Sequence, residues 1–303
     1  MSHWQTGVDV GGTNTDLLFL NRQTGEYKVD KLSTTTSDQS LAVIQGIESG
    51  PSPIAELAAI VHGTTIATNA VLERKGARCG LITTRGFRDI LELGRRTRPN
   101  NYGMTGSFEP LIDRDLRLEV SERLDARGRV LLPLNENQVL MALKTLHERG
   151  AEAVVIHFLH AYANPVHEQR AAEIARKNWP TGFISISSDI LREVREFERG
   201  STAAVNAYVQ PVLSGYLSRI SDRLAEAGFG HNLLVMQGNG GTLTAPAAAR
   251  QPVQTVMSGP AAGAVAAAHI GQQSGFDNLI ACDMGGTSFD VSVIVGATPS
   301  LSA

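Results

Sequence analysis

The sequence predicts an α/β protein that contains two similar phosphate-binding halves. Strand-like apolar runs alternate with helical patterns along 303 residues, of which 42% are hydrophobic. An eight-residue pattern, D-x-G-G-T-x-x-D, occurs at residues 9–16 and again at residues 283–290. A chain of this length can bury a sizeable core and form two domains.

The expected elements follow one another in an order typical of a mixed sheet. The first three strands come close together before the first helix, which is consistent with a mixed sheet. Residues 98–134 are rich in proline, glycine and charge, so we expect an insertion with a short β element there. Strands are expected at residues 7–10, 17–20, 27–32, 59–62, 79–83, 153–158 and 183–187, and helices at residues 41–47 and 136–149.

The last third of the chain is richer in helical patterns. Residues 202–227 have apolar side chains at helical spacing, and Pro211 should kink this helix or split it in two. A helix with proline in its first turn is expected at residues 258–268, followed by strands at 278–283 and 291–295. We expect a domain change near residues 187–195, which divides the chain into residues 1–187 and 188–303.

The repeated pattern has the residue types of a phosphate-binding hairpin. In each copy a strand ends at the first aspartate, and two glycines then turn the backbone so that successive N–H groups point at one anion. A single copy could equally be an ordinary tight turn, but two copies near opposite ends favour nucleotide binding. A strand follows each turn, whereas a P-loop or Rossmann turn opens a helix.

The aspartates of the pattern imply a divalent cation. A carboxylate repels phosphate unless a cation lies between them, and Mg²⁺ is usually held by one or two carboxylates, water and substrate phosphates. Asp9 and Asp283 are therefore predicted as metal-binding residues. The predicted phosphate-binding residues are Gly11, Gly12, Thr13, Asn14, Gly285, Gly286 and Thr287.

Hairpin phosphate loops in two similar halves resemble the fold of actin, sugar kinases and heat-shock chaperone ATPases. Further blocks with a recognisable pattern lie at residues 62–70, 73–77, 83–89, 195–199, 206–208, 237–241 and 258–263. Together with the two hairpins, they resemble the hydantoinase A and oxoprolinase family, although Asn14 and the residues around Gly238 depart from the family pattern. This resemblance implies an actin-like ATPase (ribonuclease H-like) fold, with one half nearly complete and the second half begun, because members of the family are more than twice as long.

The resemblance also implies an activity. Members of this family use ATP to phosphorylate a lactam, hydantoin or ketone oxygen, and a partner subunit of the hydantoinase B type completes ring opening or carboxylation. ATP and Mg²⁺ are thus the expected cofactors, and a cyclic amide hydrolase is the expected enzyme class. The resemblance also makes Asp9 and Asp283 the expected catalytic residues. The alternatives are a sugar or acid kinase of the same fold, a chaperone-like ATP switch, or a truncated module that only binds partners.

Composition sets limits on other functions. The net charge of −3 gives no preference for nucleic acid or anionic membranes, and no apolar run approaches 18 residues. The N-terminus has no apolar signal segment, so a cytoplasmic protein is expected. Cys79 and Cys282 both fall in strands that look buried, where we expect reduced structural thiols.

Several further groups have competing interpretations. The arginines at 85, 88, 95, 96 and 98 are expected to form a solvated face with one or two anion contacts, not a nucleic-acid patch. The histidines at 157, 160 and 167 lack neighbouring ligands at metal-binding spacing. His62 is either a satisfied core histidine or part of a second anion-binding turn with Gly63, Thr64 and Thr65.

Overall fold

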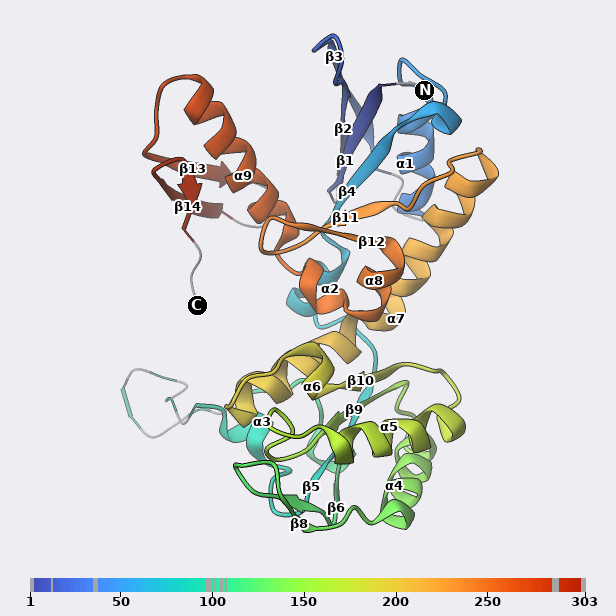
Figure 1. Cartoon of the computed structure of the whole chain (residues 1–303), viewed down its shortest axis with the longest axis vertical. Coiled ribbons are helices and arrows are strands. Elements are labelled where there is room, and N and C mark those ends of the chain that lie inside the picture. The colour runs from blue at the N-terminus through green and yellow to red at the C-terminus, as the bar shows by residue number, and fades with distance from the viewer. Residues whose placement is uncertain are drawn as a thin grey trace. The chain divides into compact units, whose positions relative to one another are not determined.

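The computed structural model describes residues 3–300 except residues 12, 35–37, 96, 98–99, 101, 104–105, 107 and 285–288. Two compact units are present: the first combines Met1–Leu72 with Leu213–Ala303, and the second is Glu73–Val212 (Figure 1). The second unit is therefore an insertion within the first. The units are defined by contacts in space, and the division of the sequence at residues 187 and 188 stays a prediction.

A six-stranded mixed sheet is the framework of the first unit, with strand order β12-β11-β4-β1-β2-β3. Strands β1 to β3 form an antiparallel meander, and β4 and β11 are added in parallel at the other edge of β1. The expected mixed sheet is thus confirmed. The strands are β1 Trp4–Val10, β2 Asn14–Asn21, β3 Tyr27–Ser33, β4 Ala59–Thr64, β11 Leu234–Met236 and β12 Thr242–Thr244.

One face of this sheet carries the core of the first unit. The alternation of β1 and β2 buries Val8, Val10, Leu17 and Phe19 beneath α1 (Gln39–Glu48) and the later part of α7 (Glu196–Glu226). Helix α1 packs so closely that a Cβ on Gly46 would come within 2.8 Å of Leu17. Burying each large apolar side chain contributes about 1.5–3 kcal/mol.

Helix α7 is one continuous helix of 31 residues that contains Pro211. Of the two outcomes expected for this proline, splitting does not occur, and the helix also begins earlier than the sequence pattern indicated. Residues on both sides of the proline, Val209 and Leu213, are completely buried. Tertiary packing therefore maintains the helix despite the missing backbone hydrogen bond.

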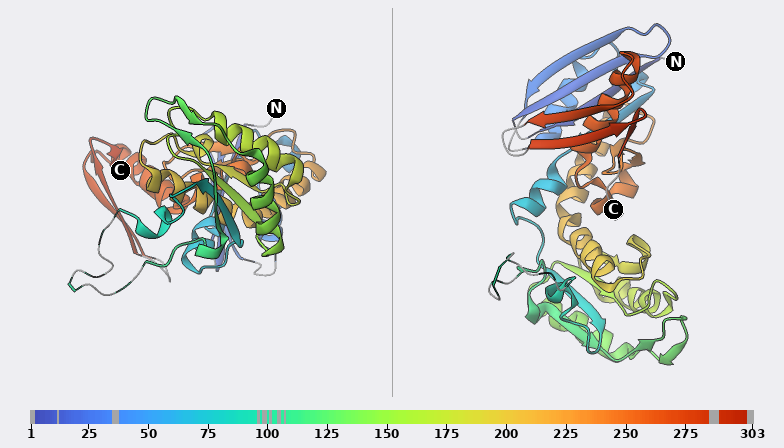
Figure 2. Two further views of the ribbon diagram at one scale, coloured as in Figure 1. Left: turned by 90° about the horizontal axis from the view of Figure 1, so that it is seen from below. Right: turned by 90° about the vertical axis from the view of Figure 1, so that its left-hand side faces the viewer.

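The second hairpin belongs to a separate small antiparallel sheet, drawn in red in Figure 2 (right), of β13 (Leu279–Met284), β14 (Phe289–Val295) and β15 (Thr298–Pro299). Helix α9 (Ser258–Gln273) packs on one face and buries Ile294. The opposite face is exposed. The predicted burial of Cys282 is wrong for this reason, whereas Cys79 is buried, and both thiols are free.

The second unit contains a four-stranded sheet, β10-β9-β5-β6, in which all neighbours are parallel. The predicted insertion is partly wrong, because β6 is a strand of this sheet, while β7 (Arg123–Leu124) and β8 (Val130–Leu132) form the short β element. The sheet strands are β5 Cys79–Thr84, β6 Arg117–Val120, β9 Ala153–His157 and β10 Ile184–Ile186.

Helices connect these strands in both units. In the second unit these are α3 Ile90–Leu93, α4 Glu136–Glu148, α5 Val166–Asn178 and α6 Ser187–Ile190, and in the first unit α2 Ile66–Leu72 and α8 Ala245–Arg250. Short 3-10 turns lie at Ile54–Glu56, Arg114–Leu116 and Pro252–Thr255. Within the part of the chain that the structure describes, no helix has the length and apolar character required to cross a membrane.

Candidate phosphate-binding site

The first predicted hairpin is the turn between β1 and β2. Asp9 and Asp16 lie directly opposite each other in the antiparallel pair, and the Gly11 N–H donates to the Asn14 carbonyl at 2.9 Å to close the turn. Thr13 is exposed at the tip and Asn14 begins β2, whereas Gly12 lies outside the described residues. The structure therefore forms this hairpin at the residues where the sequence predicts it.

Thr34, directly after β3, braces this turn and was not identified from the sequence. Its N–H donates to the Thr13 carbonyl at 2.9 Å, and its hydroxyl donates to the Gly11 carbonyl at 3.0 Å. The same hydroxyl lies 3.0 Å from the Thr15 hydroxyl, and Thr34 is only 8% exposed. One buried residue thus holds two carbonyls of the turn and fixes its shape. The role of Thr34 could not be predicted from the sequence around it, since its contact with the turn depends on the pairing of β2 with β3.

The carboxylate of Asp9 lies against the neighbouring strand. Asp9 pairs with Gly63 of β4, and a Cβ on Gly63 would come within 2.8 Å of the Asp9 carboxylate oxygen. Desolvation raises the pKa of Asp9, and the charges of Asp16 and then Asp283 raise it further, although part of the residue remains exposed. Further negative charge is therefore unfavourable here unless a cation accompanies it.

The strands of the second hairpin repeat the register of the first. Asp283 and Asp290 are directly opposite each other, in the register of Asp9 and Asp16. Asp283 and Asp290 also line a cavity of about 660 Å³ between α9 and this hairpin. The tip, with the predicted residues Gly285, Gly286 and Thr287, lies outside the described residues.

The donor set suits magnesium held together with phosphates. Among the described residues no group of three or more histidine, cysteine, aspartate or glutamate side chains is arranged to hold a metal ion by itself. Mg²⁺ commonly takes one or two carboxylates and completes its shell with water and substrate phosphates, so Asp9 and Asp283 fit it as hard oxygen donors. Their assignment as catalytic and metal-binding residues stays a prediction.

His62 is a satisfied core histidine. Its Nδ1 lies 3.3 Å from the Val8 carbonyl and its Nε2 lies 3.0 Å from the Tyr216 hydroxyl. A carbonyl can only accept, so Nδ1 carries the proton and Nε2 accepts from tyrosine. Burial lowers the pKa of His62 to about 4, which keeps the ring neutral. Of the two interpretations of this residue, the structure shows the structural one.

The other ambiguous groups also have structural partners. His157 Nε2 contacts the Glu196 carbonyl at 2.8 Å, and His167 Nδ1 contacts Glu122 at 2.7 Å. Within the described residues neither histidine belongs to a group of three or more histidine, cysteine, aspartate or glutamate side chains that could hold a metal ion. In the arginine group, Arg95 pairs with a carboxylate at 2.6 Å, while the arginines at 96 and 98 lie outside the described residues.

Comparisons with known proteins cover nearly the whole chain. Residues 5–179 match the hydantoinase/oxoprolinase N-terminal region, and residues 199–302 match the hydantoinase/oxoprolinase domain. An uncharacterized protein from Methanocaldococcus jannaschii is 37% identical over 98% of this chain and 44% of its own length. Caprolactamase subunit alpha from Pseudomonas jessenii is 33% identical over 99% of this chain and 44% of its own length.

A solved structure supports the same relationship. The nucleotide-free structure of acetone carboxylase, solved in work on ATP-dependent acetone carboxylation, matches with a TM-score of 0.89 and 30% identity, over 99% of this chain and 46% of that chain. The predicted actin-like α/β fold class is confirmed. The chain spans less than half the length of these relatives.

Proposed function

Since the chain belongs to the hydantoinase/oxoprolinase family, we propose that it forms the nucleotide-binding part of an enzyme that uses ATP to activate a carbonyl group. The observation that carries this proposal is the pair of hairpins with identical aspartate register, Asp9 opposite Asp16 and Asp283 opposite Asp290. The charge of Asp283 also acts on Asp9, so the two hairpins contribute to one electrostatic environment.

ATP would supply a phosphoryl group to the carbonyl oxygen, which would make the carbonyl carbon of a lactam or hydantoin a better electrophile and would activate a ketone as a carbon acid. Amide resonance makes a lactam carbonyl unreactive, and phosphoryl transfer depends mainly on positioning and charge neutralisation. In the proposed site Asp9 and Asp283 hold Mg²⁺, and the backbone N–H groups and threonine hydroxyls of the two turns bind the phosphates. Thr34 keeps the first turn in the shape that binding requires.

A second subunit would complete the reaction. The caprolactamase relative is named as one subunit of its enzyme, which supports a partner for this chain as well. A hydantoinase B-type subunit is the proposed partner, and ring-opening hydrolysis of a cyclic amide is the proposed outcome, with carboxylation of a ketone as the variant that the acetone carboxylase likeness supports. The cytoplasmic location stays a prediction.

The decisive experiment replaces each of the two aspartates in the full-length enzyme and measures activity in the presence of the partner subunit. Asp9→Asn and Asp283→Asn keep the size of the side chain and remove a charge that Mg²⁺ and the transferred phosphoryl group require. We expect ADP release in the presence of a lactam to fall by several orders of magnitude, since each 1.36 kcal/mol of lost transition-state stabilisation is a factor of ten. Circular dichroism should show that both variants remain folded.

Thr24→Ala is the matched control, because Thr24 is exposed in the loop between β2 and β3 and lies away from the turn. It should keep the parental rate. If both aspartate variants release ADP at the parental rate, the hairpins are not the active site. A phosphorylated product released together with ADP would show instead that the enzyme is a kinase.

A further inference from the structure

We propose that the second unit has a binding site for a small organic carboxylate, in a cavity between α3 and the first turn of α7. The cavity has a volume of about 440 Å³, within the range of small-molecule sites. Its apolar walls include Phe87, Ile90, Leu93 and Phe197, and its cationic groups are Arg95 and Arg195. These residues all lie in the second unit, so the proposal is independent of the phosphate-binding hairpins.

The cavity lies where an open parallel sheet usually binds ligands. Strand β5 ends at Thr84, and the cavity wall begins two residues later at Gly86, where φ is +90°. All strand pairs in this sheet are parallel, and ligands of such sheets bind outside the carboxyl ends of the strands. The chain then turns into α3, which supplies the apolar residues of the wall.

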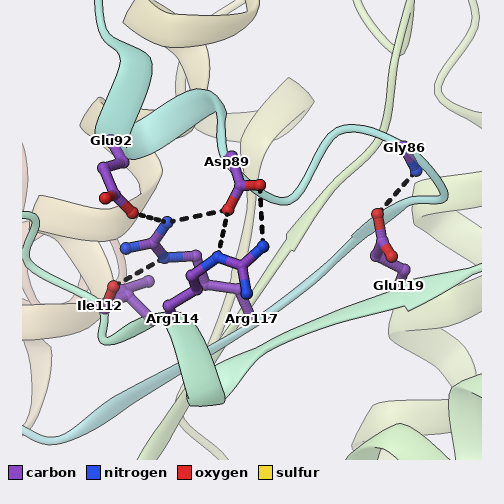
Figure 3. A network of polar contacts seen from close by, with 7 residues as sticks. All are labelled: Gly86, Asp89, Glu92, Ile112, Arg114, Arg117 and Glu119. Carbon is purple, nitrogen blue, oxygen red and sulfur yellow. Dashed lines mark hydrogen bonds and ion pairs between the residues drawn. The ribbon is translucent and has the colours of Figure 1, made fainter.

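A polar network holds this wall in place (Figure 3). Arg117 is 1% exposed, and its guanidinium donates to the Ile112 carbonyl at 2.9 Å and to Glu92 of α3 at 3.0 Å. Arg114 donates two hydrogen bonds, of 3.0 and 3.2 Å, to Asp89 at the start of α3. The Gly86 N–H donates to Glu119 at 2.6 Å. Residues of the wall and of α3 are therefore anchored both to β6 and to the 3-10 turn that precedes it.

The charges indicate which ligand fits. Arg95 Nε lies 2.6 Å from one oxygen of Glu198, and Arg195 lies 4.0 Å from the same oxygen. Each guanidinium has five N–H donors, so one shared carboxylate oxygen leaves most of them for a ligand, and both side chains are more than 60% exposed. A carboxylate can accept two parallel hydrogen bonds from each guanidinium.

The surrounding groups make a dianion unfavourable. Asp89, Glu196 and Glu198 also line the cavity, and their negative charges would repel a phosphate dianion more strongly than a monoanion. The rings of Phe87 and Phe197 suit an apolar body attached to the carboxylate. A second cavity of about 430 Å³, which shares Gly94, Arg95 and Phe197 with the first, offers further apolar space.

Saturation-transfer NMR with hexanoate and benzoate, and with their neutral amides, tests this assignment. We expect both carboxylates to bind and the amides to bind at least tenfold more weakly. The Arg95→Gln/Arg195→Gln double variant should weaken carboxylate binding by at least tenfold and leave thermal stability nearly unchanged, since both arginines are exposed. Arg192→Gln is the matched control, because Arg192 is exposed and does not line either cavity.

Three results would overturn the proposal: no binding of either carboxylate, equal binding of the amides, or unchanged binding by the double variant. Leu93→Trp gives an independent test, because it places a larger ring in the cavity wall without changing a charge. It should abolish carboxylate binding, whereas binding that survives this variant would place the carboxylate elsewhere.

Discussion

Thr34 braces the turn between β1 and β2 through both its hydroxyl and its backbone N–H. Thr34 donates to the Gly11 carbonyl and contacts the Thr15 hydroxyl, while its backbone N–H holds the Thr13 carbonyl. The turn itself has only one described backbone hydrogen bond of its own, from Gly11 to Asn14. Its conformation therefore depends on a residue that is remote in sequence and contacts no ligand in the proposed site.

Thr34→Val tests this dependence at the residue scale. Valine has nearly the same shape but cannot donate, so the Gly11 carbonyl loses its partner and stability should fall by about 1–2 kcal/mol. We expect the affinity of the full-length enzyme for ATP to fall at least tenfold, measured by titration calorimetry, with little change in the Michaelis constant for the carbonyl substrate. Thr242→Val, at an exposed position of β12, should change neither. Parental ATP affinity in Thr34→Val would show that Thr34 is only structural.

At the scale of elements, α7 and β4 are joined by a buried polar contact. Tyr216 of α7 donates to His62 of β4, next to the register position of Asp9 and Gly63. Burial raises the pKa of Tyr216 above its usual value and lowers the pKa of His62 to about 4, so both groups are neutral near pH 7. Helix α7 thereby stabilises β4, the strand against which the Asp9 carboxylate lies.

Tyr216→Phe should cost about 1–3 kcal/mol of unfolding free energy at pH 7, because it leaves the buried Nε2 without a donor. In the parent, His62 is neutral when folded and gains a proton more easily when unfolded, so stability should fall as the pH falls from about 6.5 towards 4. Urea denaturation at pH 7 and pH 5 measures both effects. Tyr27→Phe, at an exposed position, is the control. A variant as stable as the parent would rule out a role for this contact.

On the scale of the whole molecule, the two hairpins have the same register but are covered on opposite faces. In the first, α1 covers the side chains of Val8, Leu17 and Phe19. The corresponding positions of the second hairpin are exposed, and cross-strand pairing places Ile280 beside Val293, Cys282 beside Val291 and Met284 beside Phe289. This face is a continuous apolar surface, and such surfaces promote association.

We therefore expect the chain of residues 1–303 to self-associate at high concentration. Val291→Thr combined with Val293→Thr keeps the β-branched shape and makes the face more polar, so it should shift the population towards monomer in sedimentation velocity experiments. Val130→Thr, at a comparably exposed position of the second unit, should have no such effect. A parental chain that is monomeric at high concentration would contradict this expectation.

The features of the fold that depend on local sequence patterns could be predicted. The features that depend on pairing between distant residues could not. The hairpins and most strands were predictable, because alternation and glycine pairs are local signals. Strand β6 was missed since its first residue is a buried arginine, whose charge is satisfied in the folded chain by Asp89, Glu92 and the Ile112 carbonyl. Strands β11 and β12 were missed because each has three residues. Thr34 acquires its role only through the pairing of β2 with β3.

The first unit is built from two segments of the sequence, and this division affects the order in which it can fold during synthesis on the ribosome. Its strands β1 to β4 are synthesised before the 140 residues of Glu73–Val212, and the buried residues of α7 that complete their core come afterwards. At typical rates of translation this delay lasts roughly 7–30 seconds. During that time the apolar face of the nascent sheet has α1 as its cover but not yet α7. The second unit, although it begins later, can therefore finish folding first, and the apolar face of β1 to β4 stays partly uncovered until α7 emerges.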